Sequence, residues 1–185
     1  MTIGEVAGVS ALAAIAAFIL AAISIALFFG GAGSFWGPVN DIFAAVTVLL
    51  LIPVIVAVLR LAPDDIGPWF AIICWAAVAG ALLIAVVQVL LVFGVVSLAT
   101  SFTVGGIGIV PIVIWAVGLA YLVFARDMLP VEIGWLLAAT LVIAGLLTVS
   151  SMVAPWPVTG VMGVLFVVVV VGWLAQLSGE LRAAV

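Results

Sequence analysis

The sequence has no histidine and no lysine, and it contains a single cysteine, Cys74, among its 185 residues. Without imidazole, histidine-based acid–base catalysis, haem ligation through histidine and the usual zinc or copper sites are excluded. Without an amine there is no retinal Schiff base, and one thiol makes neither an intrachain disulfide nor a redox pair. We therefore expect a protein that is not an enzyme and that holds no cofactor and no metal.

Charge is scarce as well: charged residues make up 5% of the chain and hydrophobic residues 70%. A soluble domain carries about a quarter charged residues, so this chain has too little polar surface to face water on all sides. Its net charge of −4 argues against nucleic acid and against a polybasic grip on anionic lipid headgroups. We expect an integral, multi-pass membrane protein whose main partner is the lipid bilayer.

Long apolar runs divide the chain into six segments, each of the length that crosses a bilayer as a helix, about 20 residues. The connections between them are short, and none is large enough for a soluble domain. The sequence predicts an all-α integral membrane protein, with a single transmembrane domain over residues 1–185 and six transmembrane helices. Their approximate bounds are 6–29, 41–61, 68–95, 105–125, 131–153 and 157–178.

The only basic residues, Arg60, Arg126 and Arg182, close the second, fourth and sixth segments. In a chain that crosses six times, these three ends lie on the same face. Short cytoplasmic loops hold the excess of basic residues, so we expect that face and both termini to be cytoplasmic. The acids also lie at segment ends, which leaves no ionisable side chain to mark a path for ions or protons.

A short motif recurs along the chain. LAPDDIGPW at 61–69 is echoed by LPVEIGW at 129–135, and Ile-Gly also stands at residues 3 and 4. Proline ends the preceding helix, and acids such as Asp64, Asp65 and Glu132 are favoured at the N-terminus of the next one. The alternative for the motif is a contact with a cytoplasmic partner. The pattern predicts three tandem two-helix hairpin repeats, of approximately 1–62, 63–129 and 130–185.

Three hairpins in tandem resemble the architecture of the HdeD-type bacterial membrane proteins. The size of the chain and its first segment, rich in small residues, are similar to the substrate-binding components of energy-coupling vitamin transporters. The first resemblance implies a helical membrane protein, and the second implies binding of a small molecule. Both rest on architecture, and neither carries a residue's role over to this chain.

Small residues gather in the first and third segments, where alanines recur at every fourth position. Such rows let two helix backbones approach closely, which drives association in lipid. The second and sixth segments are bulkier. We therefore expect the odd-numbered helices to form the packed interior and the even-numbered helices to face lipid more. The predicted helix-packing residues are Ala13, Ala17, Ala21, Ala77, Ala81 and Ala85.

The few polar residues at membrane depth point to the stretch SLATSFTVGGIGIVP at 97–111, together with Gln88. Proline frees a helix carbonyl, which can line a transport cavity or mark a simple bend. For Gln88 the alternative is an interhelical hydrogen bond. Asn40-Asp41 is expected to cap the second helix. The candidate solute or interhelical polar contacts are Gln88, Ser101, Thr103, Gly105, Gly106, Gly108 and Pro111.

These features favour a non-catalytic membrane protein that acts through helix packing, as a homo-oligomer or as an accessory subunit of a membrane complex. The alternative is a binding protein or facilitator for a small neutral or apolar solute. The two hypotheses differ in the role of Gln88 and of residues 97–111, which is structural in the first and functional in the second.

Overall fold

The computed structural model describes residues 1–153 and 156–184, with the side chains of 150–159 outside the description. It is all-helical, and its six long helices are each long and apolar enough to cross a membrane, as the sequence predicts. A 3-10 helix, η1 (Asp64–Ile66), precedes the third of them. The long helices are α1 (Ile3–Phe29), α2 (Trp36–Leu61), α3 (Pro68–Val92), α4 (Leu98–Arg126), α5 (Val131–Val153) and α6 (Trp156–Ala183).

Two helices, α2 and α4, begin five or more residues earlier than predicted. α4 starts at Leu98 because Ser97 caps it, its hydroxyl accepting a hydrogen bond of 3.1 Å from the Thr100 amide. The glycines that follow therefore lie inside a helix and do not belong to a loop. α2 starts at Trp36, so the expected Asn40-Asp41 cap is wrong: both residues are helical, and the Asn40 amide donates to the Asp41 carboxylate at 3.2 Å.

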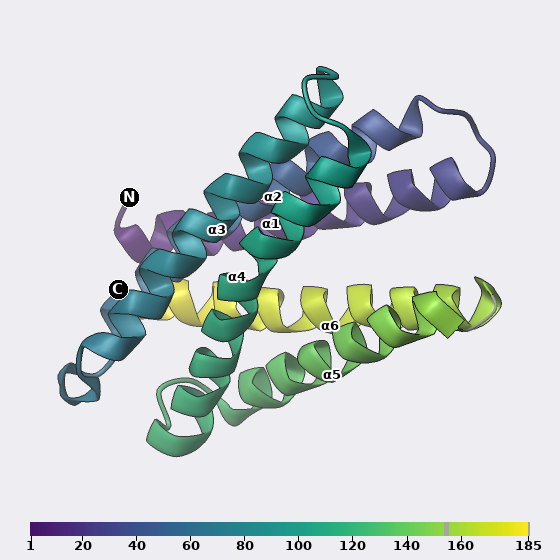
Figure 1. Ribbon diagram of the computed structural model, residues 1–185. Helices are drawn as coiled ribbons and strands as arrows, with labels where there is room; N and C mark the ends of the chain where they lie inside the picture. Colours follow the sequence, from purple (N-terminus) through teal and green to yellow (C-terminus); the bar gives the residue numbers. More distant parts are fainter. Residues whose placement is uncertain (154–155, 185) are drawn as a thin grey trace.

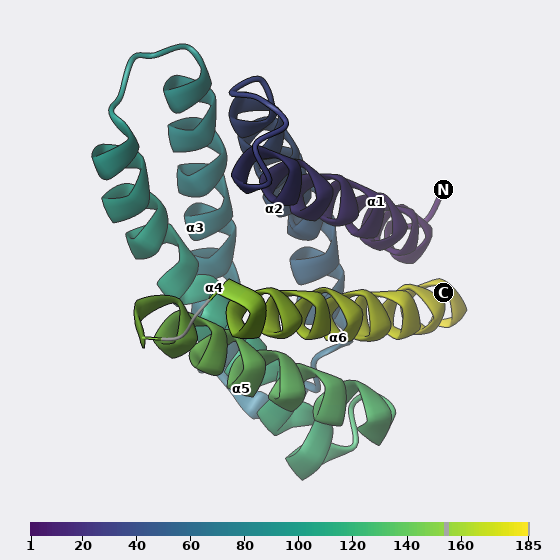
Figure 2. The same cartoon turned by 90° about the vertical axis from the view of Figure 1, so that its right-hand side faces the viewer.

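The helices form a closed ring in chain order. Each helix packs against the next, and α6 returns to pack against α1. Figures 1 and 2 show that this closure places the two chain termini near each other, away from the turns that join α1 to α2 and α3 to α4. We call the helix ends that carry both termini and Arg60, Arg126 and Arg182 the arginine half, and the opposite ends the far half.

The buried core lies in the arginine half. It is built from the first turns of α1, α3 and α5 and the last turns of α2, α4 and α6. These are close contacts between hydrocarbon side chains, and they stabilise the ring through many small dispersion attractions. The largest fully buried side chains include Ile55, Phe70, Trp115, Leu119, Ile133, Leu174 and Leu177.

In the far half the helices separate into pairs. The α1–α2 pair buries Ala21 and Ala45, and the α3–α4 pair buries Ala85 and Ser101. No described side chain at 140–149 in α5 or at 160–172 in α6 is buried. The three hairpin tips accordingly diverge in Figure 1. Among the described residues, burial is therefore concentrated in the arginine half.

The predicted division into interior odd-numbered and lipid-facing even-numbered helices is wrong. α3, α4 and α2 have the largest buried shares, and α1 is less buried than α2 or α4. The buried small residues of α1 lie on one face of the helix. Ala7, Ala11 and Ala14 are buried there, separated by four and then three residues, which is the spacing of left-handed helix packing. The opposite face of α1 stays apolar and exposed.

Five of the six predicted packing alanines are buried, namely Ala17, Ala21, Ala77, Ala81 and Ala85. The prediction is wrong for Ala13, which lies on the exposed face of α1. A row taken at every fourth residue drifts by about 40° per step around a helix of 3.6 residues per turn. Residues in such a row therefore rotate away from the line of contact with a neighbouring helix after one or two steps.

The ring is closed by a polar contact between α1 and α6. The Ser178 side chain is fully buried, and its hydroxyl donates a 2.8 Å hydrogen bond to the Gly8 carbonyl. A methyl group at Gly8 would stand 2.5 Å from Arg182 Cγ and 2.9 Å from the Ser178 carbonyl oxygen. Only glycine allows this approach. The contact continues toward the far half, where the Phe18 and Phe166 rings meet edge to face at 6.0 Å.

The three Ile-Gly copies differ in backbone structure. Ile3-Gly4 opens α1 and Ile133-Gly134 lies in the first turns of α5, whereas Ile66 belongs to η1 and Gly67, with φ of 77°, precedes α3. Asp64 and Asp65 likewise lie in η1 and not in α3. The hairpin pairs are present, but the internal repeat stays a prediction.

The crossing of α3 and α4 gives a matched test. A methyl group at Gly108 would stand 2.7 Å from Ile84 Cγ1 and 2.9 Å from the Gly80 carbonyl oxygen, whereas one at Gly106 has no neighbour within 4 Å. We expect Gly108→Ala to lower the free energy of unfolding by about 1–3 kcal/mol through overpacking. Gly106→Ala should raise it by about 0.5–1 kcal/mol through backbone entropy. Unfolding in mixed micelles measures both, and equal effects would contradict the crossing.

Candidate functional site

The predicted polar contacts all fall on the α3–α4 hairpin, but they do not face one site. Ser101 and Gly108 are buried, and the Pro111 ring packs where a side chain on Gly80 would stand. Thr103 is exposed, and its hydroxyl donates to the Ala99 carbonyl of its own helix at 3.0 Å. Gly105 and Gly106 face open space. The structure therefore brings part of the predicted set into the helix crossing and leaves the rest on the outer surface.

Gln88 lies in the last turns of α3, in the far half. Its Oε1 atom is buried and has no hydrogen-bond partner among the described residues. A buried amide oxygen that forms no hydrogen bond loses the interaction it had with water, at a cost of about 1–3 kcal/mol. Gln88 therefore adds nothing through this atom to the α3–α4 contact within a single chain.

Other buried hydroxyls need no partner from a neighbouring helix. The Ser24 hydroxyl donates to the Leu20 carbonyl at 2.7 Å, and the Thr47 hydroxyl donates to the Phe43 carbonyl at 2.8 Å. In both cases the acceptor lies one turn earlier in the same helix. Because both hydroxyls form their hydrogen bonds within their own helices, the contact surface between the helices stays apolar.

Two tryptophans meet at the centre of the core. The Trp115 ring from α4 and the Trp173 ring from α6 have centroids 6.4 Å apart. Both indole Nε1 atoms are buried, and neither has a hydrogen-bond partner among the described residues. The two rings tie non-neighbouring helices of the ring together.

The three arginines have three different environments. Arg126, at the end of α4, forms an ion pair of 2.8 Å with Asp65 in η1. Arg182, at the end of α6, donates to the Ser178 carbonyl and hydroxyl, both at 3.1 Å, and so covers the α1–α6 contact. Arg60, at the end of α2, forms no ion pair or hydrogen bond with a described residue.

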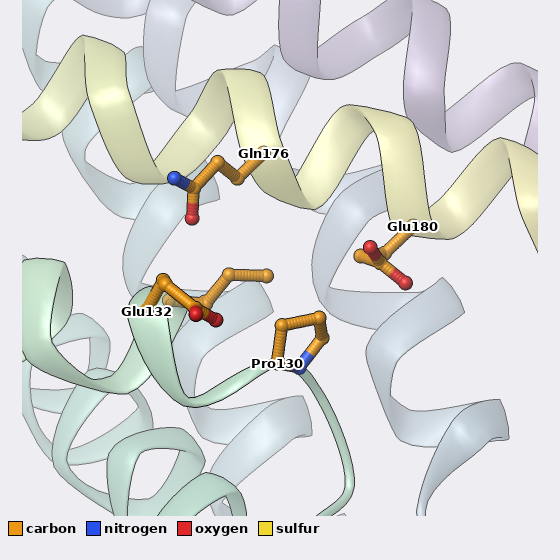
Figure 3. Close-up of a pocket in the computed structure, with 5 residues that line it drawn as sticks. Pro130, Glu132, Gln176 and Glu180 are labelled. Carbon is orange, nitrogen blue, oxygen red and sulfur yellow. The ribbon is translucent and has the colours of Figure 1, made fainter.

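Two cavities are described, and both lie in the arginine half. The first, of about 170 Å³, opens between the start of α5 and the last turns of α6. Figure 3 shows the Gln176 amide pointing toward the start of α5, with Glu132 below it and Glu180 beside Pro130. Two carboxylates, which the sequence separates by almost fifty residues, therefore share one opening.

The second cavity, of about 190 Å³, lies where the start of α1 and the ends of α2 and α6 converge. Its only charged side chain is Arg60. Both cavities are smaller than the roughly 300–1,000 Å³ of pockets for drug-sized ligands, and neither includes Gln88 or residues 97–111. The second cavity is lined by Ile3, Gly4, Ala57, Arg60, Leu61, Leu181 and Ala184.

The chemistry of the first cavity is limited to its two carboxylates and one amide. Glu132 and Gln176 are exposed, and Glu180 is half-buried. Within the described part of the chain, no group of three His, Cys, Asp or Glu side chains is placed to hold a metal ion. No sequence pattern marks this cavity, because its residues come from α6 and from the start of α5, whose relative position is set by helix packing.

Comparison with protein families, with curated proteins and with solved structures finds no match to this chain.

Gln88 provides a test of its role. We expect Gln88→Leu to leave the free energy of unfolding unchanged or to raise it by up to about 1–3 kcal/mol, because the buried acceptor without a partner is removed. Gln176→Leu, at an exposed amide, is the control and should change it by no more than about 0.5 kcal/mol. A loss of about 0.6–2 kcal/mol in Gln88→Leu, the value of an interhelical hydrogen bond, would show that the amide ties helices together.

Proposed function

We propose that the protein is a non-catalytic membrane subunit that associates, with a second copy or with another membrane protein, through the far half of its helix ring. One observation carries the proposal: the ring is packed at the arginine end, while the far halves of α5 and α6 bury no described side chain. Large apolar residues such as Val142, Val161 and Val164 are about 60% exposed there.

The positions of the glycines also support the far half as the association surface. In the arginine half Gly8, Gly118 and Gly134 each lie against a neighbouring helix. Gly145, Gly160 and Gly163, in the far half, have no heavy atom of a described residue within 4 Å of where a side chain would begin. Glycine on a membrane helix lets a second backbone approach closely. The far half of the α5–α6 hairpin therefore presents close-approach positions that this chain leaves unused.

A second candidate function is binding of a small neutral or apolar solute beside Gln88. The unpartnered Oε1 of Gln88 favours it, because a solute donor would complete that atom's hydrogen bonding. The two described cavities lie at the opposite end of the helices, which makes association the better-supported proposal.

The orientation belongs to the same proposal. We propose that the arginine half faces the cytoplasm, since basic residues collect on the cytoplasmic side. Single cysteines at Ser34 and Asp64, both exposed, in a Cys74→Ala background report on the two ends of the bundle. A membrane-impermeant maleimide should label Ser34→Cys on intact cells and Asp64→Cys only after permeabilisation. Labelling in the reverse order would invert the orientation.

Association is tested with two equally exposed positions in the same background. Val164 in the far half of α6 is 64% exposed, and Ile72 in the arginine half of α3 is 65% exposed. With a short bismaleimide in native membranes, we expect Val164→Cys to form a cross-linked species with a second copy or another subunit. Ile72→Cys should remain monomeric. Equal cross-linking at the two positions, or none at Val164→Cys across several linker lengths, would remove the support for the far half as the interface.

A further inference from the structure

The cavity beside Arg60 combines one charge with apolar walls. Five of its seven lining residues, Ile3, Ala57, Leu61, Leu181 and Ala184, have hydrocarbon side chains, and they come from three helices. It lies at the very ends of those helices, where a spanning helix leaves the hydrocarbon and reaches the lipid headgroups. A site of this kind matches a molecule with a charged head and an apolar tail.

The charge in this cavity is not neutralised by the chain's described acids. Asp65 is paired with Arg126 at 2.8 Å, and Glu5 accepts from the Thr2 amide at 2.8 Å in the cap of α1. Asp64 follows Arg60 by four residues, but the extended backbone at Ala62 ends α2 between them, so the two are not neighbours on one helix face. The Arg60 guanidinium keeps its five N–H donors for another partner.

The start of α1 forms one wall of the same cavity, through Ile3 and Gly4, the first two residues of the helix. The Thr2 hydroxyl and the Glu5 carboxylate already cap this helix end. The Arg60 guanidinium is therefore the group in this cavity that can recognise a phosphate oxygen. At about 190 Å³, the cavity has room for a headgroup and the first part of a chain, and not for a whole lipid.

We propose that this cavity is a binding site for the phosphate of an anionic phospholipid, held by Arg60, with the adjoining glycerol and acyl carbons against Ala57, Leu61 and Leu181. Basic pockets between membrane helices bind anionic headgroups in this way. The site is independent of the association surface, since it lies at the opposite end of the bundle. The lipid would brace α1, α2 and α6 where the ring closes.

The test uses the full chain in nanodiscs of mixed phosphatidylglycerol and phosphatidylcholine, followed by native mass spectrometry of the retained lipid. We expect one phosphatidylglycerol per chain and about a fivefold lower occupancy in Arg60→Gln, from about 1 kcal/mol per arginine at the membrane surface. Arg126→Gln is the matched control: it removes the same charge from the end of a helix, but its arginine is already paired, so occupancy should not change.

A second variant tests the cavity without altering its charge. Ala184 is exposed and follows the end of α6, so Ala184→Trp should fill the opening, leave the fold intact and reduce lipid occupancy as Arg60→Gln does. Equal retention in wild type and Arg60→Gln, or equal loss in Arg126→Gln, would overturn the proposal. Soluble glycerol phosphate serves as the chain-free probe. If it raises the unfolding temperature as much as the lipid does, the site holds a free phosphate and the lipid assignment is wrong.

Discussion

The hydrogen bond from Ser178 to the Gly8 carbonyl closes the helix ring, and the rest of the architecture depends on that closure. Apart from the α1–α6 contact, the long helices pack against their neighbours in sequence, and Trp115 and Trp173 join α4 to α6. The approach requires glycine at position 8, because a side chain there would meet both the α6 backbone and Arg182. A buried hydroxyl with an acceptor on another helix also fixes the register of α1 against α6, which apolar packing alone specifies weakly.

The closure concentrates packing at one end of the molecule. Trp115 and Trp173 meet inside the ring, and the Arg126–Asp65 ion pair joins the end of α4 to the turn before α3. Toward the far half, the buried contacts lie mainly within the hairpins, such as that of Gly80 with Gly108, and the Phe18 and Phe166 rings still join α1 to α6. The arginine half of the ring is therefore closely packed and holds the proposed headgroup site. The far half is less packed and forms the proposed association surface.

The sequence predicted the six helices and the short connections, because apolar runs of spanning length leave few other structures open to them. It placed Gln88 and residues 97–111 at a common end of the α3–α4 hairpin, yet it could not separate buried Ser101 and Gly108 from outward-facing Thr103 and Gly106. The direction in which these residues face depends on where α4 begins. The Ser97 cap places that start at Leu98, two turns before the predicted start. The prediction that odd-numbered helices form the interior was wrong because the small residues of α1 pack on only one of its faces.

By itself, the sequence determined the class of the molecule: an all-helical chain with six helices long and apolar enough to span a membrane. Composition and length decide these properties, so they can be read along the chain. Only the tertiary structure decided which helices meet and that Glu132 shares a cavity with Glu180. It also decided that Arg126 and Arg182 have partners while Arg60 has none among the described residues. Those facts depend on the rotation and tilt of helices in contact, which are set by residues far apart in sequence and by no local pattern.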